Sequence, residues 1–175
     1  MDIRTAHAGD AETLATLLAA YLAERFPGHV GTSAAALERD VLSGAGGMRV
    51  LLADAHGQPA GFVAWHPTYD LHWGKSGAQI ADLYVVPARR GLGLALGLVA
   101  AVCALTRRDG GSYLQGTSFD RASAVGRFYE RIAVAFDSAE CHCSGRAFRR
   151  LAELDGQPPR TIVRGLPPKT WNYEP

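Results

Sequence analysis

The stretch that decides the fold is Ile80-Ala81-Asp82-Leu83-Tyr84-Val85-Val86-Pro87-Ala88-Arg89-Arg90-Gly91-Leu92-Gly93-Leu94-Ala95-Leu96. Its first half is rich in aliphatic, β-branched and aromatic residues, which predicts a strand over 79–86. Pro87 cannot donate a hydrogen bond to a sheet, so the strand should end there. Two arginines and two glycines follow, and then an apolar run continues to Leu105. This order predicts a strand, a tight turn and a long helix over 91–108.

The glycine-rich turn predicts an anion site at the start of that helix. The first turn of a helix has unpaired backbone N–H groups, and the positive end of the helix dipole lies beside them. Gly91 and Gly93 lack side chains, so a ligand can approach these amides closely. The arrangement is suited to a phosphate or pyrophosphate.

Two common phosphate-binding motifs do not fit the turn. A P-loop requires Lys followed by Ser or Thr, and neither follows here. A dinucleotide fingerprint requires a small residue where Leu96 stands, and it requires an acidic residue about 20 positions later. Residues 110–119 contain no Asp or Glu. An ordinary Gly-rich connection remains the simplest alternative to a ligand site.

The pattern that does fit is [QR]-x-x-G-x-[GA], read as Arg90, Gly93 and Ala95 after the segment Asp-Leu-Tyr-Val-Val-Pro. This segment resembles the coenzyme A loop of the GCN5-related N-acetyltransferase (GNAT) family. The resemblance implies acetyl-CoA as cosubstrate. It also implies a set of cofactor-binding positions: Val85, Val86, Arg90, Gly91, Leu92, Gly93, Leu94 and Ala95. In the family, backbone N–H groups near the end of the strand, here around Val85 and Val86, bind the pantetheine arm and the acetyl oxygen.

A second resemblance lies further along the chain. Phe128-Tyr129-Glu130-Arg131 is similar to the F-Y-E-[KR] segment of these enzymes, in which the tyrosine protonates the departing thiolate. A phenol is protonated at neutral pH and is a suitable donor. The alternative for Tyr129 is a core residue on the apolar face of a helix. The family often has an Asn shortly before this tyrosine; here no Asn is present, and Ser123 is the candidate substitute.

Asp82 is the predicted general base, because it lies on the key strand where many relatives have an acidic residue near the acceptor. It would take the amine proton directly or through water. A structural carboxylate is the alternative, and Asp70, His66 and His72 are rival bases. Residues 69–85 also resemble the W-x-G-K…E-D-[IL]-Y-V segment of diamine acetyltransferases. Ala81 replaces the expected Glu of that segment, so a polyamine-like acceptor is only a lead.

The rest of the chain predicts a single α/β domain with a GNAT-like mixed sheet and a central β-α-β crossover flanked by helices. The domain is expected to span residues 1–155, and the Pro-containing tail, residues 156–175, is expected to be extended or poorly ordered. The expected elements are strands at 3–6, 48–53, 60–65, 112–117, 133–136 and 145–154, helices at 11–25 and 33–42, a loop at 66–77 and a helix from Ser123.

Composition narrows the class of protein. The 175 residues are 47% hydrophobic and 20% charged, an ordinary globular balance. Residues 1–80 carry a net charge of −3, and residues 81–175 carry +4. The acidic first half would suit a cationic substrate, and the basic second half would suit a polyanionic cofactor. No basic run suggests nucleic-acid binding, and no stretch is long enough to predict a membrane span or a signal peptide.

The sequence has three cysteines, Cys103, Cys141 and Cys143. An odd number without a secretion signal predicts a protein of the reducing cytosol. Cys103 is expected in the core. The Cys141-His142-Cys143 segment lacks a second pair at zinc spacing, so no metal is predicted. The predicted partners are coenzyme A and a small-molecule amine, and a homodimer is an expectation because dimers are common among similar enzymes.

The predicted activity is acetyl transfer from acetyl-CoA to a primary amine in a ternary complex. Alternatives remain: a non-catalytic acyl-CoA-binding or regulatory module on the same fold, a nucleotide-binding protein, or an N-acetyltransferase acting on a protein or peptide amine.

Overall fold

The computed structural model describes residues 2–117, 123–134, 143, 145–155 and 157–174. The chain forms two compact units, Met1–Arg121 and Ala122–Pro175, and each is described by itself. The predicted domain over residues 1–155, with a tail over 156–175, stays a prediction.

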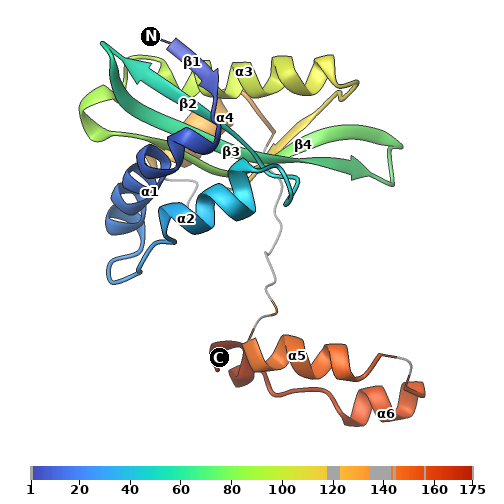
Figure 1. Ribbon diagram of the computed structural model, residues 1–175. Coiled ribbons are helices and arrows are strands. Elements are labelled where there is room, and N and C mark those ends of the chain that lie inside the picture. Colours follow the sequence, from blue (N-terminus) through green and yellow to red (C-terminus); the bar gives the residue numbers. More distant parts are fainter. Residues whose placement is uncertain (1, 118–122, 135–142, 144, 156, 175) are drawn as a thin grey trace. The chain divides into compact units, whose positions relative to one another are not determined.

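The first unit is built on one mixed sheet of five strands (Figure 1). The strands lie side by side in chain order: β1 (Asp2–Thr5), β2 (Arg49–Ala55), β3 (Gln58–Asp70), β4 (Lys75–Val85) and β5 (Leu114–Gly116). The first three pairings are antiparallel, whereas β4 and β5 are parallel and are connected through α3 (Leu94–Arg108). The predicted mixed sheet with a central β-α-β crossover is confirmed.

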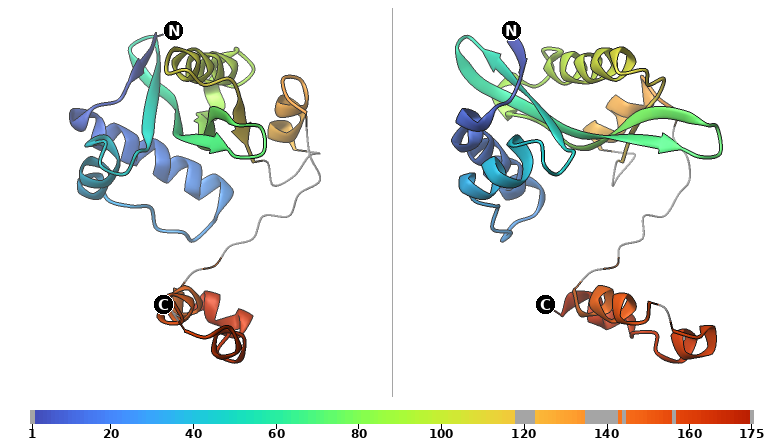
Figure 2. Two further views of the ribbon diagram at one scale, coloured as in Figure 1. Left: turned by 90° about the vertical axis from the view of Figure 1, so that its right-hand side faces the viewer. Right: turned by 45° about the vertical axis from the view of Figure 1, so that its right-hand side comes forward.

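Helices cover both faces of this sheet (Figure 2). α1 (Ala11–Arg25) and the short α2 (Ala34–Leu37), which continues into a π-helical turn over Glu38–Leu42, lie on one face, and α3 lies on the other. Successive residues of a strand point to opposite faces, so each strand contributes side chains to the packing on both faces of the sheet. The core on the α1 face consists of Leu14, Leu17, Leu37, Val50, Leu52, Phe62, Ala64 and Tyr84. The buried residues of α3 include Leu94, Leu98, Val99 and Val102.

The predicted loop over 66–77 is wrong for most of its length. β3 and β4 continue through this region and pair from His66 with Gln79 outward to Asp70 with Lys75. The turn between them is held by Asp70, whose Oδ1 accepts hydrogen bonds from the backbone N–H groups of His72 at 2.8 Å and Trp73 at 3.0 Å. Gly74 completes the turn with a φ of 61°.

The second unit is helical in its described residues. It contains α4 (Ala124–Glu130), α5 (Gly145–Glu153), α6 (Pro159–Arg164) and a 3₁₀ helix over Lys169–Tyr173. The predicted strand over 145–154 is therefore wrong, and so is the extended tail. The segment has no β-branched residue and is rich in Arg, Ala, Leu and Glu, which favour helix. Of the strand predicted at 133–136, residues 135 and 136 lie outside the described residues, and Ala133 and Val134 are not in a strand.

Several smaller expectations concern cysteines, metals and membranes. Cys103 is solvent-exposed on α3 and is not a core residue; Cys143 is also exposed, whereas Cys141 and His142 lie outside the described residues. Among the residues that the structure describes, no three His, Cys, Asp or Glu side chains are grouped as metal ligands would be. Within the same residues, no helix combines the length and the apolar character that a membrane crossing requires.

Candidate active site

The site begins at a β-bulge in the middle of β4. Ala64 pairs with Asp82 and the next β3 residue, Trp65, pairs with Ile80, so Ala81 has no opposite residue on β3. A bulge bends its strand and changes the direction of the side chains around it. The parallel partner β5 pairs with β4 only from Ala78 to Ile80, before the bulge. Within the described part of the chain, the end of β4 from Asp82 to Val85 therefore has β3 as its only strand partner.

The two predicted amide donors on β4 differ in direction. The N–H of Val86 donates to the carbonyl of Ala60 at 3.0 Å, so it is already used within the sheet. Hydrogen-bonded and non-hydrogen-bonded pairs alternate along an antiparallel ladder, so the neighbouring pair of Val85 with Gly61 is of the second kind. The N–H of Val85 consequently points away from β3, toward the side on which β4 and β5 separate. This geometry favours Val85 over Val86 as the donor to a ligand.

The Gly-rich loop leads from this strand end into α3. A 3₁₀ turn over Pro87–Arg89 is followed by Gly91 and Gly93, which have φ values of 75° and 82°. Both values are in the left-handed region that favours glycine. A Cβ built at either position would meet no other atom within 4 Å, so the backbone is open there.

Gly93 is the N-cap of α3, and the N–H of Gly97 donates to its carbonyl at 2.9 Å. The N–H groups of Leu94, Ala95 and Leu96 precede that first helical bond and have no acceptor within the helix. Leu94 is buried and fixes the helix on the sheet, whereas Leu92 is exposed. Unpaired amides, an open glycine backbone and a positive helix end fit a pyrophosphate such as that of coenzyme A.

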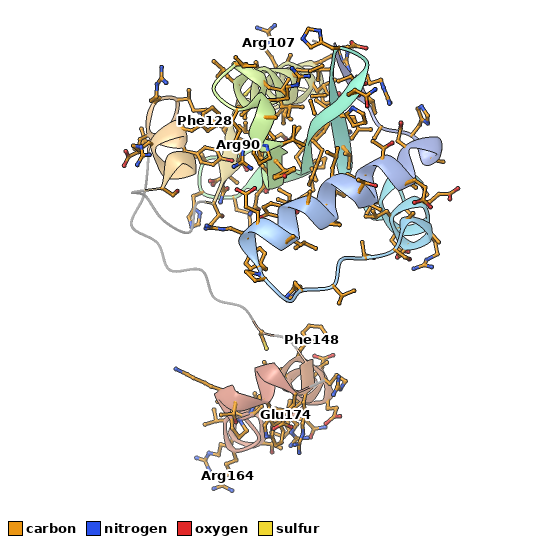
Figure 3. The ribbon with its side chains drawn as sticks, turned by 90° about the vertical axis from the view of Figure 1, so that its left-hand side faces the viewer. Arg90, Arg107, Phe128, Phe148, Arg164 and Glu174 are labelled. Atoms are coloured by element: carbon orange, nitrogen blue, oxygen red, sulfur yellow. The ribbon has the colours of Figure 1, made fainter. Side chains whose placement is uncertain are left out.

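Arg90 connects the loop to α1 (Figure 3). Its guanidinium forms two hydrogen bonds with the carboxylate of Glu24, at 2.6 and 2.8 Å, and its Nε donates to the carbonyl of Val85 at 2.8 Å. The same group lies 5.6 Å from the centre of the Tyr84 ring, within range of a cation–π interaction. Arg90 therefore holds the end of β4, the loop and α1 in a fixed relation.

Asp82 lies on the face of the sheet that α1 covers, since Tyr84, two residues later, packs in that core. The carboxylate is half-buried, and this burial raises its pKa, while a hydrogen bond with Tyr21 lowers the pKa in part. A carboxylate whose pKa is raised toward neutrality is a better proton acceptor.

The rival bases are not equally well placed. Asp70 and His72 lie at the tip of the β3–β4 hairpin, and the carboxylate of Asp70 is used to hold the turn. The tip is seven strand residues from Asp82, roughly 20 Å at ~3.3 Å per residue. Trp73 and Lys75 of the diamine-like segment are equally distant. His66 pairs with Gln79, three residues from Asp82 along β4, and lies on the same face of the sheet. It is therefore close enough to Asp82 to remain an alternative base.

Ser123 and Tyr129 belong to the second unit. Ser123 is the N-cap of α4, and its hydroxyl accepts a hydrogen bond from the N–H of Gly126 at 3.0 Å. Tyr129 is half-buried near the end of the same helix, with its ring centre 5.3 Å from that of Phe128. The structure brings Asp82, Val85 and the Gly-rich loop together within the first unit, while the roles of Ser123 and Tyr129 stay predictions.

Two residues near the site were not recognised as functional candidates from the sequence. Tyr21 was predicted only as part of the helix over 11–25, and its ring centre lies 5.8 Å from that of Tyr84 on β4. Glu24 was not singled out, and it is the partner of Arg90. Their spacing of three residues places both on one side of α1, but only the folded chain shows what that side faces.

A bulged central strand leads through an open Gly-rich loop into the N-terminus of α3, and this arrangement fits the pyrophosphate of coenzyme A. Residues 14–133 match the acetyltransferase (GNAT) family. The chain belongs to this family and is an acyltransferase that uses acetyl-CoA as acetyl donor. No curated protein matches the chain at a significant level.

Three solved structures with the same fold illustrate the range of proteins that the chain resembles. A ribosomal-protein-alanine N-acetyltransferase from Brucella melitensis biovar Abortus 2308 is 26% identical, with a TM-score of 0.66 over 81% of this chain and 98% of that one. An integron cassette protein from the mobile metagenome of V. cholerae is 19% identical, with a TM-score of 0.72 over 87% and 97% of the two chains. An aminoglycoside acetyltransferase from an uncultured soil metagenomic sample is 15% identical, with a TM-score of 0.67 over 81% and 92%.

Proposed function

We propose that this acetyltransferase moves the acetyl group to a primary amine of a small molecule, by direct transfer in a ternary complex. The observation that carries the proposal is the half-buried Asp82 beside the end of β4, where the N–H of Val85 points away from β3. Amine acylation requires a proton acceptor and an oxyanion donor, and these two candidates lie three residues apart on one strand.

Each step has a residue assigned to it. Acetyl-CoA supplies the thioester, at whose carbonyl carbon the C–N bond forms as the C–S bond breaks. Asp82 takes the proton that the amine nitrogen must lose. The N–H of Val85 stabilises the negative charge on the carbonyl oxygen. Tyr129 gives its proton to the leaving sulfur, and the amides at the start of α3 bind the pyrophosphate. Ser123 is the proposed contact to the pantetheine arm.

A polyamine-like amine is the lead acceptor, from the resemblance of residues 69–85. Two observations weaken this lead. Glu24, the nearby carboxylate on α1, is neutralised by Arg90, and the Trp-Gly-Lys part of the segment lies at the hairpin tip. A protein or peptide amine is the second candidate, and it is supported by the 26% identity with a ribosomal-protein-alanine N-acetyltransferase. A homodimer remains a prediction.

A release assay tests the activity and separates these acceptors. Free thiol is measured with acetyl-CoA and a panel of amines: spermidine, an aminoglycoside, free amino acids and a short peptide that begins with alanine. We expect turnover with at least one small amine. Turnover with the peptide alone would favour the second candidate. Binding of acetyl-CoA without turnover of any amine would favour the non-catalytic module.

The proton donor has its own test. Tyr129→Phe removes the phenol and keeps the ring, so kcat should fall by ~10²–10⁴ with little change in acetyl-CoA affinity. Tyr69→Phe at the exposed hairpin tip is the matched control and should leave kcat as it is. An unchanged kcat in Tyr129→Phe would remove Tyr129 from the role.

A further inference from the structure

The last three helices lie outside the part of the chain that matches the acetyltransferase family. We call residues 145–174, which contain α5, α6 and the 3₁₀ helix over Lys169–Tyr173, the C-terminal segment. The family match ends at residue 133. The ribosomal-protein-alanine N-acetyltransferase is matched over 98% of its own length, yet it covers only 81% of this chain. A site formed by the C-terminal segment alone would therefore be additional to the cofactor site of the family.

Positive charge is concentrated in the C-terminal segment. It contains six Lys and Arg and three Asp and Glu, a net charge of +3. The rest of the chain contains twelve and fourteen, a net charge of −2. Five of the six cations are arginines, and arginine binds carboxylate and phosphate oxygens through paired N–H donors. The segment is therefore suited to anions, whereas the rest of the chain is not.

Three of these arginines line a pocket beside α5. The residues around it are Arg146, Arg149, Arg150, Glu153 and Trp171. The four residues from α5 are spaced by three and four positions, so they lie on one side of the helix. Trp171 comes from the 3₁₀ helix and supplies an aromatic wall. The pocket has a volume of about 430 Å³, which is within the ~300–1,000 Å³ of small-molecule sites.

Contacts within the segment hold the pocket in shape. The guanidinium of Arg146 lies 3.5 Å from the centre of the Trp171 ring and donates to the Glu174 carboxylate at 2.8 Å. The backbone N–H of Arg146 donates to the carbonyl of Glu174 at 2.9 Å. The Nε of Arg150 donates to the carbonyl of Gly165 at 3.3 Å. Two guanidinium groups are therefore held in place before a ligand binds, which lowers the entropy cost of binding.

The carboxylates at the pocket do not cancel its positive charge. Glu153 pairs with Arg150 at 3.2 Å and Glu174 pairs with Arg146, and the two glutamates are 65% and 45% exposed. Ion pairs this exposed are weak. A guanidinium has five N–H donors, and a carboxylate in the paired geometry accepts two of them. Three arginines and two glutamates therefore leave a net charge of +1 and donors for a further oxyanion.

We infer that this pocket is a second binding site, which takes a small organic anion. The arginines hold the carboxylate or phosphate of that anion, and Trp171 contacts its apolar part. The site goes beyond acetyl transfer, because it needs neither the proposed base nor a particular amine acceptor.

The test is a titration of the full chain, followed by tryptophan fluorescence. Phenyl phosphate and benzoate are the probes, and they distinguish the two kinds of oxyanion. Phenol supplies the ring alone, and inorganic phosphate supplies the anion alone. We expect a saturable change with at least one of the two probes, weaker binding of inorganic phosphate and none of phenol. Trp171→Phe should remove most of the change, because Trp65 and Trp73 belong to the first unit.

A matched pair of variants locates the binding. Arg146 and Arg150 also hold the segment together, so Arg149 is the residue to change. In Arg149→Gln the Kd of the tighter probe should rise by about 10–100-fold, as expected for lost hydrogen bonds to a charged group. Arg164→Gln removes the same charge from an exposed residue outside the pocket, and its Kd should stay within about twofold.

The Tm of each variant without ligand is the control for folding. If Arg149→Gln lowers this Tm, Arg149→Lys takes its place. Lysine keeps the charge without the paired donors, so the Kd should again rise, though less. Equal weakening in the Arg149 and Arg164 variants would indicate attraction to net charge alone and would overturn the inference. A change that does not saturate, or that persists in Trp171→Phe, would also overturn it.

A titration with saturating coenzyme A separates the pocket from the cofactor site. The Kd of the probe should stay within about twofold, since the pocket consists of residues of the second unit alone. Competition by coenzyme A would mean that the probe occupies the cofactor site, and the second site would then be wrong. Loss of acetyl transfer in any other experiment leaves this result unaffected.

Discussion

The two halves of the β3–β4 hairpin are made of the same two strands and have different surroundings. In the inner half, Phe62, Ala64 and Tyr84 are buried beneath α1, and the bulge and the Gly-rich loop lie beside them. In the outer half, Tyr69, Leu71 and Trp73 are 57%, 86% and 65% exposed. Both halves are therefore paired strands, whereas buried side chains and open backbone amides are found in the inner half, which helices cover.

The largest expected effect is the loss of acetyl-CoA binding when the glycine before α3 is substituted. A glycine in the β3–β4 turn is the comparison. Gly93 and Gly74 both have positive φ, but only Gly93 lies at the start of α3. Gly93→Trp should abolish acetyl-CoA binding, since a side chain would fill the phosphate site. At ~100 times Kd the unmodified chain should gain ~2.7 kcal/mol, and each kcal/mol raises Tm by ~2–4 °C.

The measurement for this pair is Tm with and without acetyl-CoA. The unmodified chain and Gly74→Trp should both show a rise of about 5–10 °C, and Gly93→Trp should show none. Retained binding in Gly93→Trp would mean that the pyrophosphate binds elsewhere. The Tm of each variant without ligand is the control for folding.

A smaller effect on stability should distinguish the same two halves. Phe62 is 2% exposed, and its truncation in Phe62→Ala should cost ~3–5 kcal/mol. Tyr69 is largely exposed, so Tyr69→Ala should stay within ~0.5 kcal/mol. Urea unfolding of the two variants measures the difference. Equal losses would show that the outer half is covered in solution, for example by a second copy of the chain.

The sequence predicted those parts of the molecule that depend on local signals. The helix over 11–25 is observed with the predicted bounds, and the turn with Gly91 and Gly93 leads into α3 as expected. Apolar periodicity predicts the helices, Pro87 predicts the end of the strand, and the two glycines predict the turn. The anion site could be predicted for the same reason, because the unpaired amides belong to one short segment.

Other features depend on contacts between distant segments. The packing of the Tyr21 ring on Tyr84 joins α1 to β4, and the ion pair of Glu24 with Arg90 joins α1 to the loop. No local pattern in the sequence indicates either contact. The outer half of the hairpin was predicted as a loop because its polar and aromatic residues do not alternate clearly. The segment 145–154 was predicted as a strand, although its residues favour helix, and it forms α5.

The most direct test of the account compares the carboxylates of the two halves, Asp82 and Asp70. Both variants, Asp82→Asn and Asp70→Asn, keep the size of the side chain and remove its charge. With the best amine of the panel and saturating acetyl-CoA, kcat/KM of Asp82→Asn should fall by ~10²–10⁴. Asp70→Asn should stay within about twofold, as expected for a surface substitution. Full activity in Asp82→Asn, or an equal loss in both variants, would contradict the assignment of the active site to the inner half of the hairpin.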